Sequence, residues 1–209
     1  MSPRKRVKRE FPPLSGRIDR HAFDIPLTIG ILSDTHIFAG GGSRTLPTEV
    51  IELFRRFDVD LIIHGGDIVI QGVLDRLAPV APVLAVHGNN EPVELWRELP
   101  ERIVLTVGSH TIGIVHGHGG ASARAVARTA FDEPVEFVIY GHSHIPMIEE
   151  ENGIVYFNPG SPTDRRWSAH FGIGIVRIDE ERVRPELILF DRAAHLVSID
   201  PESPPGADA

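Results

Sequence analysis

One arrangement recurs five times along this chain: a short apolar segment ends in Asp, His or Asn, with glycine or serine beside it. The five polar ends are Ser33-Asp34-Thr35-His36, His64-Gly65-Gly66-Asp67, His87-Gly88-Asn89-Asn90, His116-Gly117-His118-Gly119 and Gly141-His142-Ser143-His144. In open sheets, ligands bind beyond the carboxyl ends of the strands, so five such ends can converge on one site. Glycine lets the backbone turn sharply and approach a bound ion or phosphate closely. We therefore expect the chain to fold around a polar site at its strand ends.

The segments between these polar ends alternate between strand and helix patterns. Apolar runs predict strands at 27–32, 60–64, 83–87, 103–107, 111–116, 137–140, 154–157, 171–178 and 183–190. Helical spacing predicts helices that begin near Pro47 and at 73–77, 92–99 and 122–131. The last two strands resemble a closing antiparallel pair. The predicted fold class is α/β: a four-layer α/β/β/α sandwich of two mixed β-sheets flanked by helices.

Composition divides the chain into one domain and two ends. Residues 1–24 mix basic residues with proline and glycine, and residues 193–209 end in Pro-Glu-Ser-Pro-Pro-Gly-Ala-Asp-Ala. Both ends are expected to be disordered, the first as a basic extension and the second as a tail. The chain of 209 residues is 42% hydrophobic, which suffices for one core. Residues 25–192 are therefore expected to form a single domain.

The charge of the chain is unevenly distributed. The net charge is −8, yet the first twenty residues carry seven basic and only two acidic side chains, so the body is acidic. An acidic body argues against tight binding to long nucleic acid, which depends on many phosphate contacts. No apolar run approaches the roughly 18 residues that span a bilayer, and no signal peptide is evident. We therefore expect a cytoplasmic protein without membrane contact.

The sequence contains no cysteine, which excludes a disulfide framework and thiolate metal ligands. A metal here would need imidazole, carboxylate or amide ligands. Taken singly, Asp34, Asp67 or Asn89 could be a turn or cap residue, and a lone histidine is more often structural than a ligand. Five successive strand ends of this kind rarely arise by chance, so their recurrence favours a metal site.

These residues, in this order, resemble the calcineurin-like metallophosphoesterase superfamily. Its pattern is D-x-H, G-D, G-N-x-[DE], H-G and G-H-x-H. The matching residues are Asp34-Thr35-His36, Gly66-Asp67, Gly88-Asn89-Asn90-Glu91, His116-Gly117 and Gly141-His142-Ser143-His144. The short spacing and the closing Asn158-Pro159-Gly160-Ser161 resemble the small YfcE-like phosphodiesterase branch. The similarity extends from about Leu27 to Arg166.

The resemblance implies two divalent metal ions per chain. One metal would be bound by Asp34, His36, Asp67 and His144, and the other by Asp67, Asn89, His116 and His142. Asp67 would bridge the two metals, and Asp67, Asn89 and His116 are also the expected catalytic residues. Mn²⁺ is the expected metal, and Fe, Co, Ni or Zn would suit the same oxygen and nitrogen ligands.

The expected reaction is the hydrolysis of a small phosphodiester. Two metals would lower the pKa of a shared water to give a hydroxide near neutral pH, which would attack phosphorus in line. Many members of the superfamily have a histidine after Gly-Asn that protonates the leaving group. This chain has Asn90 there, which cannot act as a general acid. We therefore expect a preference for leaving groups of low pKa, such as aryl groups.

Several polar residues have weaker assignments. His118 would line the site or hydrogen-bond to a ligand residue, and Asn90 would lie close to the substrate. Arg165 and Arg166 would contact the substrate phosphate, although a surface role is equally compatible with the sequence. For His64 and His87, a structural role is at least as well supported as one in orienting ligands.

Two alternatives remain open at the level of the sequence. A non-catalytic or weakly active scaffold would use the same fold to bind proteins, as the phosphoesterase-like subunit of retromer does. A nuclease or phosphomonoesterase would keep the chemistry and change the substrate. All seven expected ligand positions are filled, which favours an enzyme. The natural substrate and the oligomeric state are not decided, and a homodimer is one option.

Overall fold

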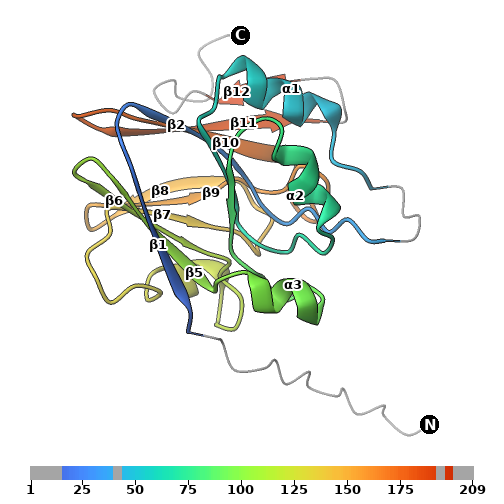
Figure 1. Cartoon of the computed structure of the whole chain (residues 1–209), viewed down its shortest axis with the longest axis horizontal. Helices are drawn as coiled ribbons and strands as arrows, with labels where there is room; N and C mark the ends of the chain where they lie inside the picture. Colours follow the sequence, from blue (N-terminus) through green and yellow to red (C-terminus); the bar gives the residue numbers. More distant parts are fainter. Residues whose placement is uncertain (1–15, 40–43, 192–195, 200–209) are drawn as a thin grey trace, which may run out of the picture.

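A computed structural model describes residues 16–39, 44–191 and 196–199 and contains two six-stranded sheets. The first has the strand order β12 (Leu196–Ile199), β11 (Val183–Phe190), β10 (Phe171–Ile178), β2 (Leu27–Leu32), β3 (Leu61–His64) and β4 (Val83–Ala85). The second has the order β1 (Ile18–Phe23), β5 (Arg102–Val107), β6 (His110–Val115), β7 (Phe137–Tyr140), β9 (Ile154–Asn158) and β8 (Met147–Glu151). In Figure 1, β2, β10 and β11 lie above β7, β8 and β9.

Both sheets are mixed, as the sequence predicted. In the first sheet β2, β3 and β4 are parallel, whereas β10 is antiparallel to both β2 and β11. In the second sheet β6, β7 and β9 are parallel, whereas β5 is antiparallel to β6 and β8 to β9. Parallel strands in each sheet therefore bring their carboxyl ends to a common edge, where the polar loops follow.

The main core lies between the two sheets. It contains fully buried branched side chains from both, including Ile29 and Ile31 of β2 and Leu105 and Ile112 of β5 and β6. Every residue of β3 and β7 is buried, which explains why their sequences are mainly apolar without alternation.

Short helices cover the outer faces of the sheets. The helices are α1 (Thr48–Arg56), α2 (Gly72–Leu77), α3 (Val93–Glu98) and α4 (Ala123–Ala127). Phe54 of α1 and Leu77 of α2 pack in one cluster with Ile62 of β3 on the outside of the first sheet. Ala127 of α4 packs with Tyr140 of β7 outside the second sheet. The predicted four-layer α/β/β/α sandwich is thus confirmed.

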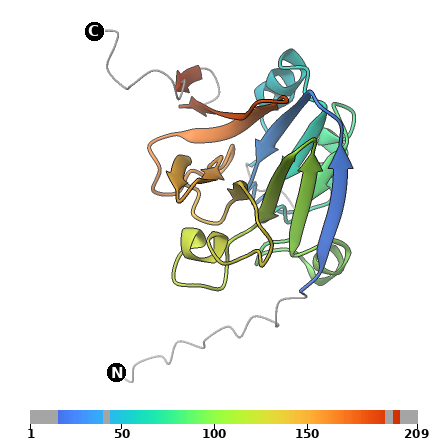
Figure 2. The same ribbon diagram turned by 90° about the vertical axis from the view of Figure 1, so that its left-hand side faces the viewer.

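The prediction that residues 1–24 are disordered is wrong for Ile18–Phe23. These residues form β1, which pairs in parallel with β5 along its whole length, and Figure 2 shows β1 in blue beside the green β5 and β6. The polar residues of this segment obscured its strand pattern, because β1 is an edge strand and only half-buried. Phe23 packs against the core between the sheets. Residues 1–15 lie outside the described residues.

The prediction for the tail is likewise wrong for Leu196–Ile199, which form β12 and pair in an antiparallel manner with β11. The sheet thereby gains a further strand beyond the expected domain limit at residue 192. Residues 192–195 and 200–209 lie outside the described part of the chain.

Two predicted elements end at least two residues earlier than expected, and one further strand was not predicted. The strand expected at 83–87 ends at Ala85, and the helix expected at 122–131 is the short α4, which Ser122 caps by accepting a hydrogen bond from the backbone N–H of Ala125. β8 was not predicted, because its Glu-Glu-Glu sequence lacks an apolar pattern. No helix among the described residues is long and apolar enough to cross a membrane.

Candidate metal centre

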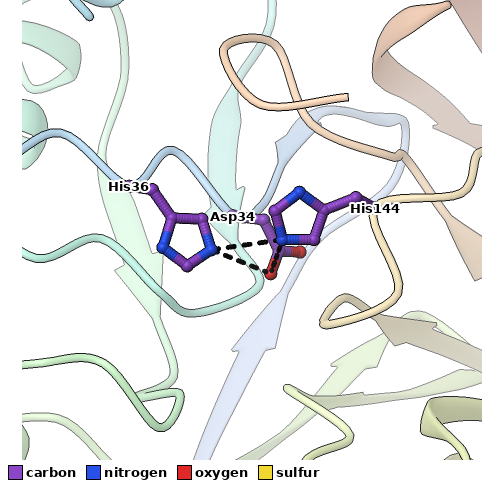
Figure 3. A group of neighbouring side chains, drawn as sticks. All are labelled: Asp34, His36 and His144. Atoms are coloured by element: carbon purple, nitrogen blue, oxygen red, sulfur yellow. Dashed lines mark hydrogen bonds and ion pairs between the residues drawn. The ribbon is translucent and has the colours of Figure 1, made fainter. Parts of the chain in front are cut away.

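Six ligand-type side chains gather into two groups where the loops after β2, β3, β6 and β7 meet. One group is Asp34, His36 and His144, and the other is Asp67, His116 and His142, with the candidate ligand atoms of each group within 4.8 Å of one another. Figure 3 shows the carboxylate and the two rings of the first group pointing toward one another. Nε2 of His36 lies 3.1 Å from Nε2 of His144, a residue 108 positions away along the chain.

Asp67 joins the two groups into one centre. Its Oδ2 atom lies 3.3 Å from Nε2 of His36 in the first group and 3.4 Å from Nε2 of His116 in its own group. Oδ1 of Asp34 lies 3.3 Å from Nε2 of His144 and 3.9 Å from Nε2 of His116. The carboxylate of Asp67 thus lies between the two groups.

Asn89 is the seventh predicted ligand residue, and the structure places it at the same centre. Its backbone N–H donates to Oδ1 of Asp67 at 2.9 Å. Its side-chain Oδ1 is buried and has no hydrogen-bond partner among the described residues. All seven predicted residues are therefore brought together.

The backbone of the loops is unusual at these positions. Five of the seven residues have φ between +45° and +66°: Asp34, His36, Asp67, His142 and His144. Such a left-handed conformation costs a non-glycine residue on the order of 1–3 kcal/mol, and it persists only where the surrounding structure enforces it. Asp is among the residues that tolerate the region best, and His is enriched there too. The tight turns allow residues two apart in sequence to reach the same point.

Hydrogen bonds from the far side of two rings direct their Nε2 atoms into the centre. Nδ1 of His116 donates to the carbonyl of Gly65 at 2.7 Å. Nδ1 of His144 donates to the carbonyl of Asp164. When Nδ1 carries the proton, Nε2 has a free lone pair, which is the form that binds a metal.

The two carboxylates are held in a similar way. Oδ2 of Asp34 accepts hydrogen bonds from Oγ of Ser33 at 2.7 Å and from the backbone N–H of His142 at 2.8 Å. Oδ1 of Asp67 accepts from the backbone N–H groups of Asn89 and Asn90, both at 2.9 Å. Each carboxylate thus has one oxygen tied to the protein and another near the histidine nitrogens.

Two glycines make room for this packing. A Cβ atom added at Gly66 would lie 2.7 Å from Nδ1 of His116, and one at Gly141 would lie 2.7 Å from Oδ2 of Asp34. Both distances are far below ordinary contact, and Gly66 also has a φ of +96°. The glycines beside the ligand residues are therefore required by close approach.

The electrostatics of the centre favour a bound cation. Burial raises the pKa of Asp67, but the nearby His116 and His36 outweigh burial and hold this pKa well below its usual range. Burial lowers the pKa of His116, but the carboxylates of Asp67 and Asp34 outweigh burial and raise this pKa to about 10. The two buried carboxylates thus stabilise positive charge beside them, whether a proton on His116 or a divalent ion.

Some buried nitrogen and oxygen atoms of these side chains have no hydrogen-bond partner, and their positions indicate whether the residues could bind a metal. Oδ1 of Asp34, Oδ1 of Asn89, Nε2 of His116 and Nδ1 of His142 are buried and make no hydrogen bond within the described chain. Leaving a buried polar group unpaired typically costs about 1–3 kcal/mol. Four such atoms in one centre fit a set of oxygen and nitrogen ligands for a metal ion.

Several supporting residues were given no role from the sequence. Glu91 accepts hydrogen bonds from the backbone N–H groups of Ile68 at 2.9 Å and Gly88 at 2.8 Å, which ties the second polar loop to the third. Nδ2 of Asn158, at the end of β9, donates to the carbonyl of Gly141 at 2.9 Å. Glu91 and Asn158 both lie within the motifs quoted above, but the sequence did not indicate which groups they would hydrogen-bond.

Asn90 and His118 both lie beside residues of the two groups. Nδ2 of Asn90 donates to Oδ2 of Asp67 at 2.7 Å, so this amide holds the carboxylate. The ring of His118 is buried, with its centroid 5.5 Å from that of His116 and 6.4 Å from that of His142. Burial and the neighbouring rings lower the pKa of His118 to about 4.

The two arginines differ from each other. The guanidinium of Arg165 donates to the carbonyl of Ser168 at 2.6 Å and lies 5.9 Å from the centre of the Phe171 ring, so it is turned into its own loop. Nη2 of Arg166, in contrast, lies 3.5 Å from Nε2 of His36. Of the pair, only Arg166 is placed against a ligand residue.

His64 and His87 surround the centre without joining either group. Nδ1 of His64 accepts from the backbone N–H of Gly66, and Nε2 lies 3.2 Å from Oγ1 of Thr35. The ring of His87 packs against Trp96, with the two centroids 5.1 Å apart. Both histidines stabilise the loops that carry the ligand residues.

Comparison with known proteins agrees with this geometry. Residues 27–181 match the family model described as the calcineurin-like phosphoesterase superfamily domain. A probable metallophosphoesterase of Methanothermobacter thermautotrophicus is 32% identical over 164 residues, which cover 78% of this chain and 92% of that protein. Phosphodiesterase MJ0936 of Methanocaldococcus jannaschii is 28% identical over 148 residues, covering 64% of this chain and 83% of that protein.

A solved structure shares the fold at low sequence identity. The zinc complex of Vps29 from Entamoeba histolytica aligns with a TM-score of 0.68 and 20% identity, covering 83% of this chain and 99% of that chain. At this level of identity the similarity concerns the fold alone.

Proposed function

This chain belongs to the calcineurin-like phosphoesterase superfamily, and we propose that it is a phosphodiesterase that uses two divalent metal ions to hydrolyse small phosphodiesters. The four buried ligand atoms without hydrogen-bond partners support this proposal most directly. They belong to Asp34, Asn89, His116 and His142, which come from four different loops and from both sheets. A purely structural polar cluster would be expected to pair these atoms with one another.

The proposed ligand sets follow the two observed groups. Asp34, His36, Asp67 and His144 would bind one ion, and Asp67, Asn89, His116 and His142 the other. Bound there, the ions would act as Lewis acids toward the phosphoryl oxygens and would activate the water that serves as the nucleophile. Mn²⁺ is the proposed metal, because the ligands are carboxylate, amide and imidazole, and Fe, Co, Ni and Zn are alternatives.

The remaining residues of the centre position groups and charge. Asn90 holds Oδ2 of Asp67 and offers no proton of suitable pKa to a leaving group, so the preference for aryl leaving groups is part of the proposal. The guanidinium of Arg166 lies close enough to His36 to bind a phosphate oxygen at the centre. His118 would line the second group. We assign Arg165 no substrate contact, because its guanidinium is bound within its own loop.

Two considerations support a small diester over other substrates. The relative MJ0936 is named a phosphodiesterase, which favours a diester over a monoester. The net charge of −8 disfavours long nucleic acid, because a polyanion would be repelled by the acidic body.

The proposal is tested by removing metal and assaying bis-p-nitrophenyl phosphate with added Mn²⁺, and then with Ni²⁺, Co²⁺ and Zn²⁺. We expect metal-restored turnover in the wild type and its loss in Asp67→Ala and His142→Ala. The His142 variant removes a ring nitrogen that has no hydrogen-bond partner, so the fold should survive the change. His170→Ala, which alters a histidine paired with Asp191 away from the two groups, is the matched control and should keep full turnover.

Absence of turnover with all four metals would contradict the proposal. Together with a tightly bound protein partner, it would favour the scaffold alternative, in which the same fold serves mainly for protein binding. Equal turnover in His142→Ala and the wild type would instead refute the assigned ligand set.

A further inference from the structure

Large apolar side chains are exposed at few places in the described chain, and three of these places adjoin the metal centre. The four exposed large apolar residues are Phe38, Val93, Ile145 and Trp167. Phe38 follows His36 by two positions, Ile145 directly follows His144, and Trp167 directly follows Arg166. Trp167 is 95% exposed and Phe38 57% exposed, although tryptophan is on average a highly buried residue. Clustered exposed apolar side chains mark binding surfaces.

Hydrogen bonds hold the loops that carry Phe38 and Trp167 side by side. Oγ of Ser161 donates to the carbonyl of Asp34 at 2.7 Å, and Oγ1 of Thr163 donates to the carbonyl of Thr35 at 2.5 Å. Three residues further on, Arg166 lies against His36. The two loops are therefore joined at three successive positions, just before the exposed side chains of Phe38 and Trp167.

The loop that carries Ile145 is tied to the same place through Asp164. The backbone carbonyl of Asp164 accepts a hydrogen bond from the ring of His144, the residue before Ile145. The carboxylate of Asp164 forms an ion pair with Arg44 at 3.0 Å. The segment that carries Ile145 is therefore joined at Asp164 to the loop that carries Trp167.

We propose that Phe38, Ile145 and Trp167 form an apolar rim that binds an aromatic group on the substrate, so that the preferred substrates are phosphodiesters with one flat apolar ester group. The inference rests on the proposed phosphodiesterase function. The diester phosphate would lie at the metal centre within reach of Arg166, and the ester group that is not cleaved would extend outward over the rim. Two of the three rim residues are aromatic, which favours a flat partner that can stack on them.

The rim is tested with two substrates that share the p-nitrophenyl leaving group. Methyl p-nitrophenyl phosphate and phenyl p-nitrophenyl phosphate differ only in the retained ester group. We expect Trp167→Ala and Phe38→Ala each to lower the ratio of kcat/KM for the phenyl over the methyl diester by about three- to tenfold. Turnover of the methyl diester should stay within about twofold of the wild type, because neither side chain belongs to the metal centre.

Two further variants distinguish contact with substrate from a general disturbance. Trp167→Phe keeps an aromatic face and should restore most of the preference for the phenyl diester. Val93→Ala removes an exposed apolar side chain on α3, outside the three loops, and should leave the ratio unchanged.

A thymidine p-nitrophenyl phosphodiester tests whether the flat group on the substrate is a nucleobase or a simple aryl group. A Trp167-dependent preference for it as well would indicate a nucleobase, and a preference for the phenyl diester alone a simple aryl group; either result supports the rim.

Binding of anions that cannot be hydrolysed tests the rim independently of turnover. Diphenylphosphinate and dimethylphosphinate carry the same charge and have carbon–phosphorus bonds in place of ester bonds. In titrations with the Mn²⁺-loaded protein we expect tighter binding of diphenylphosphinate, with the difference reduced in Trp167→Ala.

The outcomes separate the rim from the phosphodiesterase function. Trp167-dependent binding of diphenylphosphinate without turnover of any diester would uphold the rim and refute the enzyme. The alternative outcome is turnover in which both alanine variants keep the wild-type ratio of phenyl to methyl diester and the wild-type preference for diphenylphosphinate. That outcome would refute the rim but not the phosphodiesterase function.

Discussion

Several candidate ligand residues have polar atoms that are hydrogen-bonded to neighbouring loops. Nδ1 of His116 is bound to the Gly65 carbonyl, and Oδ1 of Asp67 is bound to the backbone N–H groups of Asn89 and Asn90. Such supporting contacts orient the ligands, and their loss commonly weakens metal binding by about 10–100-fold. The orientation of single side chains therefore depends on exact backbone positions in the adjacent loop.

Gly88 provides a test at the scale of one residue. A Cβ atom there would overlap Oδ1 of Asp67 and lie 2.7 Å from the backbone nitrogen of Asp67. We expect Gly88→Ala to weaken Mn²⁺ binding at least about tenfold, because the carboxylate of Asp67 must move. Titration calorimetry on the metal-free protein measures this affinity.

Gly72→Ala is the control for this substitution. The nearest atom to a Cβ at Gly72, the first residue of α2, is Cδ1 of Ile70 at 4.0 Å, so the added methyl group should be harmless. Wild-type Mn²⁺ affinity in Gly88→Ala would show that the loop relaxes around the methyl group and that close approach is not required.

At the scale of elements, each ligand loop depends on how its strand ends. β3 ends at His64, whose buried ring receives the N–H of Gly66 and contacts Thr35 in the loop after β2. His64 thus links the loop after β2 to the loop after β3, which carries Asp67. Burial lowers the pKa of His64 to about 3, so the ring is neutral in the folded protein at neutral pH.

His64 should make the stability of the protein sensitive to acid. The unfolded state binds a proton below pH 6.5, the ordinary pKa given for this histidine, whereas the folded state resists protonation down to about pH 3. Stability is therefore lost as the pH falls from 6.5 toward 3. Between pH 7 and pH 5 we expect the wild type to lose about 2 kcal/mol more than His64→Asn in free energy of unfolding.

Urea unfolding of metal-free protein at the two pH values measures this difference. Both proteins contain the other histidines, so the contribution of those residues to the pH dependence of stability cancels in the comparison. Asparagine retains an acceptor for the N–H of Gly66. Parallel loss of stability in both proteins would show that His64 is not the group responsible.

At the scale of the whole molecule, the centre connects the two sheets. Asp34, Asp67 and Asn89 follow β2, β3 and β4 of the first sheet, whereas His116, His142 and His144 follow β6 and β7 of the second. A metal bound to both groups would link loops that otherwise meet only through packing and hydrogen bonds. Metal binding should therefore be coupled to the stability of the entire fold.

Metal removal tests this coupling. A ligand that binds only the folded state adds about 2.7 kcal/mol at a concentration 100 times its Kd. We expect the Tm to fall when Mn²⁺ is removed with a chelator and to recover when the metal is restored. His142→Ala should show a smaller metal-dependent shift, and calorimetry with and without Mn²⁺ measures it. The same Tm in both conditions for the wild type would refute metal binding to the folded state at the concentration used.

Much of the fold could be predicted because its strongest signals are local. The apolar sequences of β2 and β7 predicted strands with the observed bounds, since buried strands need branched apolar residues throughout, and the largely apolar runs of β10 and β11 did the same. β1, β8 and β12 were missed because an edge strand is stabilised by its neighbour and needs no such pattern.

The sequence by itself determined which residue types stand at the strand ends, and hence the seven candidate ligands and their family resemblance. The resemblance also implied how they divide into two groups, whereas only the tertiary structure decided how each side chain is oriented, because ring tautomers and left-handed backbones depend on carbonyls and turns from other loops. The tertiary structure also separated Arg165 from Arg166, which are adjacent in sequence yet direct their guanidinium groups to different places. The exposed rim beside the centre has the same origin, since exposure depends on which loops pack together and no local pattern encodes it.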